Sequence, residues 1–238
     1  FEGITQIIGA TAGVKDINLI ISDDSAEFEL NKFEHTYSNC EIMRGPTHGA
    51  VCNWNYLLNY SASDWSILLH QDEHLRVKEE NDIALGELDS QFVYLSDLEI
   101  HFNDKVIFLP AGPRVWLVNN FPWLLVYINF IGPTGCLLVP KNINRFDENL
   151  KWLVDVDYYK SLRDIYTFRV NKNLKIISQA DTQGSITSSL KKSNIKQLHC
   201  EEAEFKNWSF SPTISFLIAI FWHIYRFFCT RVVKHENY

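Results

Sequence analysis

The chain has 238 residues, enough for one large domain or one domain with an appendage. Apolar residues make up 46% and charged residues 21%, which predicts a folded core and excludes intrinsic disorder. The net charge of −7 argues against general nucleic-acid binding, because a polyanion requires a basic patch. Five scattered cysteines form no CxxC pair and fit reduced thiols in a cytosolic setting. Work on a small molecule or at a membrane is therefore favoured.

The first part of the chain predicts two strands. INLIIS (17–22) is almost continuously apolar and ends in Asp23-Asp24-Ser25, the pattern of a strand that is buried on both faces and delivers polar groups at its carboxyl end. CEIMR (40–44) predicts a weaker second strand. The Asp-Asp-Ser turn can bind a ligand through its carboxylates, or it can cap the following helix. We expect one aspartate to cap the helix and the other to bind a ligand.

A helix and a third strand follow. Apolar residues between 49 and 62 recur at helical spacing, and the apolar run 66–69 then leads into a polar cluster of His70, Gln71, Asp72, Glu73 and His74. Strands alternating with a helix predict a doubly wound α/β sheet, in which ligands bind beyond the carboxyl ends of the strands. The acidic residues that follow the first and third strands are therefore expected to face one crevice.

Farther along, FVYL, EIHF and VIFL predict short strands with a hairpin turn at Asn103-Asp104, and GCLLVP (135–140) predicts a buried strand. A helix is expected to begin at Asp147, a plausible N-cap, with apolar residues recurring up to Leu162. Asp155 would then lie near the mouth of the cavity beside which this helix packs. LKIIS (174–178) predicts a further strand.

The segment 214–229 is apolar or aromatic except at Ser215, His223 and Arg226. It would form about 24 Å of helix, less than the roughly 30 Å needed to span a bilayer. The few polar residues form a narrow stripe, and Arg231 and Lys234 add positive charge after it. These features predict a helix that lies in the interface of an anionic membrane. Packing on the domain or in a dimer is the alternative.

In their order, these motifs resemble the family 2 glycosyltransferases, inverting enzymes of the GT-A fold that use nucleotide-sugar donors. SDDSAE resembles the family's DDxS motif, and DWSILLHQDE resembles the strand that ends in its DxD motif. The sequence FDENLKWLVDVDYYKSL (146–162) is similar to the family pattern FDExLxxxxDxDxxxRL. The predicted helix between the first two motifs contains Asn55, and the family likewise has an asparagine in this helix.

The resemblance implies an α/β fold with a mostly parallel, Rossmann-like sheet flanked by helices. The family's first strand should precede residue 1. The glycosyltransferase domain is expected over 1–208, with a nucleotide-sugar half at about 1–75 and an acceptor half at about 76–208. The amphipathic helix and basic tail would occupy 209–238.

The resemblance also implies roles for particular side chains. The nucleotide sugar would be bound by Asp23, Asp24, Ser25, Asn55 and Gln71. A divalent cation, Mn²⁺ or Mg²⁺, would be held by Asp72, with His70 and Glu73 beside it. Asp155 aligns with the family's catalytic base, and Asp157 is the reserve.

Three departures from the family pattern affect the functional prediction. His70 stands where the family usually has the first Asp of DxD, a variant that resembles a branch associated with bacterial surface polysaccharides. Trp54 replaces the arginine that commonly precedes the helix asparagine. The QxxRW motif of processive synthases is missing, which favours transfer of a single sugar.

The expected function is therefore transfer of one sugar from a UDP-, GDP- or dTDP-sugar to a lipid-linked or cell-surface glycan. We expect the protein in the cytoplasm, peripheral on the inner face of the cell membrane. The alternative is a degenerate domain that only binds a nucleotide sugar or acts as a scaffold. A nucleotidyltransferase is disfavoured because the chain lacks a Gly-rich, basic phosphate loop.

Overall fold

The computed structural model describes residues 17–25, 40–77, 88–102, 105–141, 143, 145–179, 192–208 and 211–232, and all structural statements concern these residues. The predicted turn at Asn103-Asp104 and the basic residue Lys234 lie outside them.

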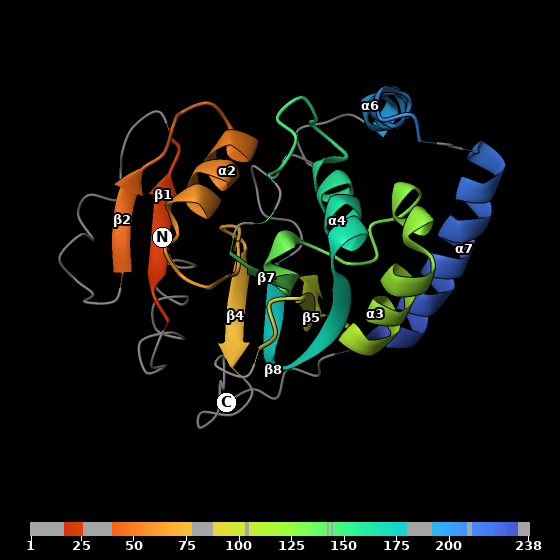
Figure 1. Ribbon diagram of the computed structural model, residues 1–238. Coiled ribbons are helices and arrows are strands. Elements are labelled where there is room, and N and C mark those ends of the chain that lie inside the picture. The colour runs from red at the N-terminus through yellow and green to blue at the C-terminus, as the bar shows by residue number, and fades with distance from the viewer. Residues whose placement is uncertain are drawn as a thin grey trace.

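A small parallel sheet lies at one side of the molecule (Figure 1). It consists of β1 (Leu19–Asp23) and β2 (Cys40–Arg44), which pair in parallel so that Asp23 lies opposite Arg44. Helix α2 (Ala50–Tyr60) lies beside this sheet. Both predicted strands and the predicted helix are confirmed, and the polar residues after β1 lie at the edge where both strands end.

A seven-stranded sheet forms the centre of the fold, with the order β3-β7-β5-β6-β9 and with β8 pairing with both β4 and β5. Its strands are β3 (Trp65–Ser66), β4 (Glu73–Val77), β5 (Phe92–Phe102), β6 (Lys105–Leu109), β7 (Leu137–Pro140), β8 (Thr167–Gln179) and β9 (Thr230–Val232). The buried strand predicted from GCLLVP is β7, and the LKIIS strand is the second half of β8.

The α/β class is confirmed, but the prediction of mostly parallel pairing is wrong for the described strands. The pairs β1–β2 and β5–β8 are parallel, whereas the other five pairs are antiparallel. Parallel neighbours need a long crossover, whereas short connections join antiparallel strands. The hairpin of β5 and β6, in which Phe102 pairs with Lys105, is one such short connection.

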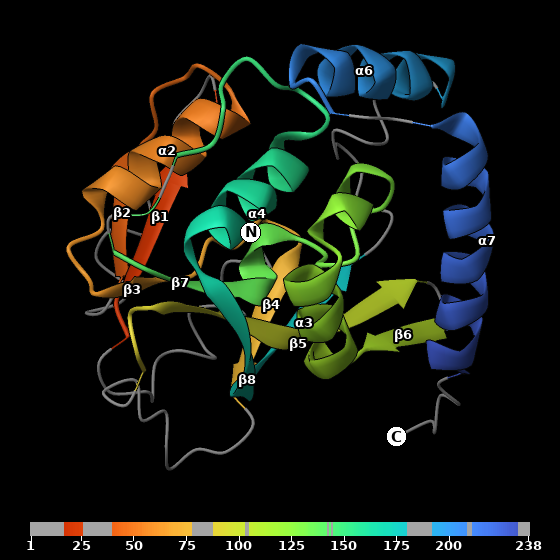
Figure 2. The ribbon, with the colours of Figure 1, turned by 45° about the vertical axis from the view of Figure 1, so that its right-hand side comes forward.

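Two helices, α3 (Ala111–Asn120) and α4 (Val154–Ile165), cover one face of the larger sheet (Figures 1 and 2). The short 3₁₀ helices η3 (Pro122–Val126) and η4 (Thr134–Cys136) lie in the connection between α3 and β7. Helix α4 begins at Val154 and not at Asp147 as predicted. Asp147 instead forms a turn in which its Oδ1 accepts hydrogen bonds from the backbone and side chain of Asn149.

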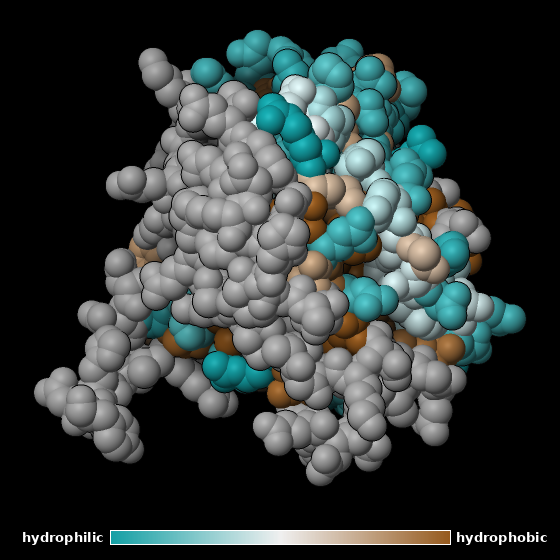
Figure 3. Space-filling model, turned by 90° about the vertical axis from the view of Figure 1, so that its left-hand side faces the viewer, coloured by the Kyte–Doolittle hydropathy of each residue, from teal (hydrophilic) through white to brown (hydrophobic). Residues whose placement is uncertain are grey.

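The core lies between this sheet and these helices. Val93, Leu95 and Leu98 of β5 are completely buried, as are Tyr159 and Leu162 of α4. On the face shown in Figure 3, hydrophobic residues lie below an upper band of hydrophilic residues. Helix α6 (Lys192–Phe205) lies at the height of this band in Figure 1. Helix α6 crosses above the beginning of α4 (Figure 2).

The C-terminal segment is joined to the larger sheet. Helix α7 (Pro212–Cys229) packs against β6, and β9 pairs with the same strand. The predicted polar stripe turns partly toward the protein at Ser215 and Arg226. The outer face is apolar, with side chains between 41% and 76% exposed at Ile214, Phe216, Leu217, Ile220, Phe221, Ile224 and Phe227. Within the described ranges, no helix combines the length and apolarity needed to cross a bilayer.

Candidate functional site

The two aspartates after β1 have different environments. Asp24 accepts hydrogen bonds from the backbone N–H of Thr47 and, at 3.0 Å, from that of Gly49, the N-cap residue of α2. Asp23 accepts hydrogen bonds from the backbone N–H and hydroxyl of Ser25. Asp24 therefore holds the backbone that leads into α2, and the expectation that one of the pair caps the following helix stays a prediction. Binding of a nucleotide by Asp23 and Ser25 stays a prediction.

Asn55 is buried on α2 and fastens a distant loop to that helix. Its amide nitrogen donates to the carbonyl oxygen of Phe146 at 3.0 Å and to Oε1 of Glu148 at 2.9 Å. Its amide oxygen accepts a hydrogen bond from the backbone N–H of Phe146 at 2.9 Å. Both amide protons are used within the protein, so the structure gives Asn55 a positioning role, and its contact with a nucleotide sugar stays a prediction.

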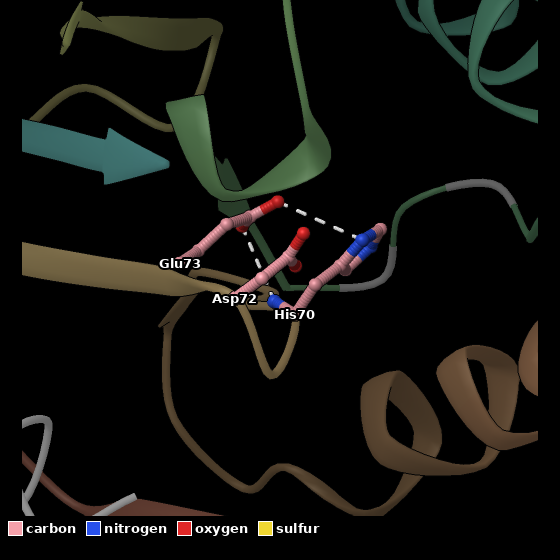
Figure 4. A group of neighbouring side chains, drawn as sticks. All are labelled: His70, Asp72 and Glu73. Carbon is pink, nitrogen blue, oxygen red and sulfur yellow. Dashed lines mark hydrogen bonds and ion pairs between the residues drawn. The ribbon is translucent and has the colours of Figure 1, made fainter. Parts of the chain in front are cut away.

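The polar cluster after β3 forms a tight turn. Regular pairing ends at Ser66, earlier than predicted, and the backbone N–H of Glu73 donates to the carbonyl of His70 at 3.1 Å. Gln71 is exposed, whereas Glu73 begins β4 and is only 1% exposed. Figure 4 shows the side chains of His70, Asp72 and Glu73 extending to the same side of the turn. Their potential ligand atoms all lie within 4.8 Å of one another.

The imidazole of His70 is held by two neighbours. Its ring stacks on Trp54 with centroids 4.7 Å apart, and Nε2 lies 2.9 Å from the hydroxyl of Thr134. That hydroxyl donates to the carbonyl of Leu68, so it accepts a hydrogen bond from Nε2–H, and in this neutral tautomer Nδ1 keeps a lone pair. Nδ1 is 3.6 Å from Oε1 of Glu73. Burial lowers the pKa of His70 despite the opposing charge of Asp72, which favours the neutral ring that a metal ion requires.

Glu73 is a buried carboxyl group at the start of β4. Burial raises its pKa to about 8, the backbone N–H groups of His70 and Gly135 act in the opposite direction, and the charges of Asp72 and Asp155 raise it further. Gly135 is required for this arrangement, because a Cβ atom there would lie 2.3 Å from Oε2 of Glu73. The turn 132–135 thus contacts the cluster directly.

Asp155 lies in the first turn of α4, and its buried Oδ1 has no hydrogen-bond partner among the residues that the structure describes. Burial raises its pKa to about 7. Because its charge also raises the pKa of Glu73, Asp155 acts on the cluster electrostatically. One turn later, the hydroxyl of Tyr159 donates to the carbonyl of Gly132 at 2.9 Å. The turn 132–135 therefore connects α4 with His70 and Glu73.

Asp157 has a different environment from Asp155. Its Oδ1 lies 2.9 Å from Nζ of Lys206, which also pairs with Asp147 at 2.8 Å. The ion pair with Lys206 occupies Oδ1 of Asp157, whereas Oδ1 of Asp155 has no hydrogen-bond partner among the described residues. The environment therefore favours Asp155 as a base and gives Asp157 a structural contact.

The donor atoms of the cluster fit a divalent cation. One imidazole nitrogen and two carboxylates match the preferences of Mn²⁺ better than those of Mg²⁺, which favours oxygen ligands. The hydrogen bond from His70 Nε2 to Thr134 would hold the ring with Nδ1 available, as outer hydrogen bonds do for metal-bound histidines. Metal binding by Asp72, His70 and Glu73 stays a prediction.

The sequence matches no known family model, and no curated protein matches it. The structure is similar to that of residues 1–349 of S. aureus TarS in complex with UDP-GlcNAc, with a TM-score of 0.55 and 15% sequence identity. The fold is of the GT-A type. A TarS complex with UDP gives a TM-score of 0.50 at 16% identity, covering 88% of this chain and 69% of that one.

The chain spans only part of these proteins. The match to the UDP-GlcNAc complex covers 89% of this chain and 65% of the TarS chain. A longer TarS structure, with a TM-score of 0.50 and 15% identity, is covered over 42% of its length. At these identities, the similarity establishes the fold and leaves activity, substrates and partners to proposal.

Three residues that contact the cluster were not predicted from the sequence to do so. Thr134 and Gly135 lie in GPTG, where tight turns alone explain the glycines, and only the structure shows their contacts with His70 and Glu73. Trp54 was noted as a departure from the family's arginine, and the structure shows it stacked on His70, itself a departure. The coincidence of these two departures is the signal that could have linked the residues.

Proposed function

We propose that the protein is a glycosyltransferase that transfers a single sugar from a nucleotide-sugar donor with inversion. The observation that supports it most strongly is the joining of the metal-competent cluster to Asp155 through the turn 132–135, within a GT-A fold. The turn contacts His70 and Glu73, the candidate cation ligands, and it contacts Tyr159, one helical turn after the candidate base Asp155.

Each side chain has a defined task in this proposal. Asp23, at the end of β1, would accept hydrogen bonds from the base or ribose of the nucleotide. Asp72, His70 and Glu73 would hold the cation. A divalent cation bound there would offset the negative charge that develops on the leaving nucleoside diphosphate. Thr134 and Trp54 keep the imidazole oriented while the sugar is transferred.

Direct displacement requires a base that takes the proton of the acceptor hydroxyl on the face opposite the leaving group. Asp155 is suited to this role, because its buried Oδ1 has no other partner and its pKa of about 7 is close to neutral pH. The attacking hydroxyl would then form the new bond as the diphosphate departs, and the anomeric centre would invert.

The sugar donor we would test first is UDP-GlcNAc, because the TarS structures with this fold hold UDP-GlcNAc and UDP. GDP- and dTDP-sugars are the next candidates. We propose a lipid-linked or cell-surface glycan as acceptor and the inner face of the cell membrane as the location. The exposed apolar face of α7 supports attachment to a membrane surface.

The decisive experiment measures UDP release from UDP-GlcNAc with Mn²⁺ or Mg²⁺ and a mixture of glycan acceptors. Asp155→Asn and Asp72→Ala should each lower turnover severely, and Asp164→Asn, at an exposed position on the same helix as Asp155, should retain it. Turnover that survives the combined Asp155→Asn and Asp72→Ala changes would refute the proposal.

A second candidate is a domain that binds a nucleotide sugar without turnover. It is favoured by one observation, that His70 occupies the position where the family has a carboxylate and is held there by Trp54 and Thr134. Calorimetry that detects UDP-GlcNAc binding, together with no turnover for any sugar donor and acceptor, would favour this candidate. Robust turnover would dismiss it.

A further inference from the structure

Helix α4 begins without a cap from its own sequence. Its N-cap residue, Leu153, offers no side-chain hydrogen bond, and the backbone N–H groups at the start of a helix have no partners within it. Because Asp155 lies in this first turn, any movement of the helix start also moves its carboxylate.

A carboxylate from α6 binds the three backbone N–H groups that immediately precede Val154, the first residue of the helix. Oε1 of Glu202 accepts hydrogen bonds from the backbone N–H of Lys151 at 2.7 Å and of Trp152 at 3.1 Å. Oε2 accepts from Trp152 at 3.1 Å and from Leu153 at 2.7 Å. Glu202 is only 6% exposed, so these bonds are shielded from water. Its negative charge also lies at the positive end of the α4 dipole.

A lysine directly after α6 holds the residues around the start of α4 at a second point. Lys206, one turn after Glu202, pairs through Nζ with Asp147 at 2.8 Å and with Asp157 at 2.9 Å. Two oppositely charged residues thus fix the residues before and after Asp155 and leave its Oδ1 unpaired. Figure 2 shows α6 lying across the beginning of α4.

We propose that Glu202 is a positioning residue that fixes the start of α4 and so sets the place of the Asp155 carboxylate relative to the acceptor hydroxyl. This inference depends on the proposed function for its kinetic consequence. Its structural part, that Glu202 orders the residues around Asp155, stands independently of the reaction.

The first measurement is hydrogen–deuterium exchange of the full chain over residues 151–157. Glu202→Ala should speed exchange there. The control is Glu201→Ala, because Glu201 is an exposed neighbour on the same helix that accepts a hydrogen bond from Gln197 at 2.7 Å. Equal protection in both variants would overturn the proposal, whether or not UDP-GlcNAc is a substrate.

The second measurement separates positioning from general stability. With UDP-GlcNAc and Mn²⁺, Glu202→Ala should lower kcat by about tenfold to hundredfold, because small displacements of a reacting group have effects of this size. The dissociation constant for UDP-GlcNAc should stay unchanged. The kcat of Glu202→Gln, which keeps one acceptor oxygen, should lie between that of Glu202→Ala and that of the unaltered protein. An unchanged kcat, or a parallel loss of UDP-GlcNAc binding, would overturn the positioning role. If the unaltered protein does not process UDP-GlcNAc, the proposed function fails for this sugar donor and exchange alone decides.

Discussion

Oε2 of Glu73 occupies space that a side chain at position 135 would need, since a Cβ atom on Gly135 would lie 2.3 Å away. The close approach lets the backbone N–H of Gly135 hydrogen-bond the buried carboxyl group. The identity of residue 135 is therefore coupled to the placement of a candidate metal ligand.

Gly135→Ala should displace Glu73 and destabilise the protein by roughly 1–3 kcal/mol, the usual effect of overpacking a core. The free energy of unfolding in urea measures this change, and Mn²⁺ binding should weaken with it. Gly112→Ala is the matched control, because nothing lies within 4 Å of a Cβ atom there. In helix α3 that change should stabilise by about 0.5–1 kcal/mol. Equal stability of the two variants would contradict the proposed coupling.

Thr134→Val should weaken Mn²⁺ binding by about tenfold to hundredfold, because the hydroxyl that holds His70 Nε2 is lost while the side-chain shape is kept. Titration of Mn²⁺ followed by electron paramagnetic resonance measures the affinity. Thr167→Val, at an exposed position of β8, should bind as the unaltered protein does. Identical affinities for both variants would show that Thr134 does not orient a ligand.

The rate of sugar transfer should rise as the pH increases through about 7, because Asp155 must be ionised to accept a proton and its pKa is about 7. Asp155→Asn should lower the rate by about 10²–10⁴-fold, the range of general base catalysis. UDP release from UDP-GlcNAc, measured across the neutral pH range, tests both points. A rate that does not change with pH in this range would exclude Asp155 as the base.

The same carboxylate should reduce stability at high pH. Its pKa in the folded protein lies above the ordinary value of 3.8, so the folded state retains a proton that the unfolded state releases, and stability is lost as pH rises toward about 7. Asp155→Asn should therefore stabilise the protein more at pH 8 than at pH 5, by roughly 1–3 kcal/mol at most. Urea unfolding at both pH values measures this difference. Asp164→Asn should show no such gain, and a gain of equal size at both pH values would contradict a buried charge.

The outer face of α7 predicts binding to anionic vesicles. Changing Phe216, Phe221 and Phe227 together to serine should weaken binding to phosphatidylserine-containing vesicles by roughly tenfold or more, because each buried phenylalanine contributes about 1.5–3 kcal/mol. Co-sedimentation measures the bound fraction. Ile165→Ser alters a side chain that is 60% exposed on α4 and is the control. Failure of the unaltered protein to sediment would instead favour a protein partner.

Local patterns in the sequence predicted most elements but not their pairing. Strands β1, β2 and β7 follow from short apolar runs, and α2 follows from helical spacing. The start of α4 was misplaced because the N-cap pattern at Asp147 is used for a turn, while Glu202, 49 residues from Leu153 in sequence, binds the backbone just before the helix. Such a contact leaves no local pattern.

The candidate site shows the same limit. The position of His70, Asp72 and Glu73 after a predicted strand indicated them as site residues. The resemblance to the family 2 glycosyltransferases indicated Asp155. The difference between Asp155 and Asp157 depends on Lys206, which lies on another helix. Likewise, Asp23 and Asp24 differ in environment because Asp24 accepts hydrogen bonds from backbone groups of Thr47 and Gly49, whereas Asp23 accepts them from Ser25. Three-dimensional neighbours, and not residue types, distinguish these pairs.

The contacts that build the site also constrain when it can form during folding. Thr134 meets His70 across 64 residues, and Leu153 meets Glu202 across 49. Contacts between residues far apart in sequence form slowly, because a long loop must close first. A nascent chain that has not yet reached α6 therefore contains Asp155 without the partner that fixes its helix. If the protein transfers sugar as proposed, we expect this ability to appear only after α6 has been synthesised.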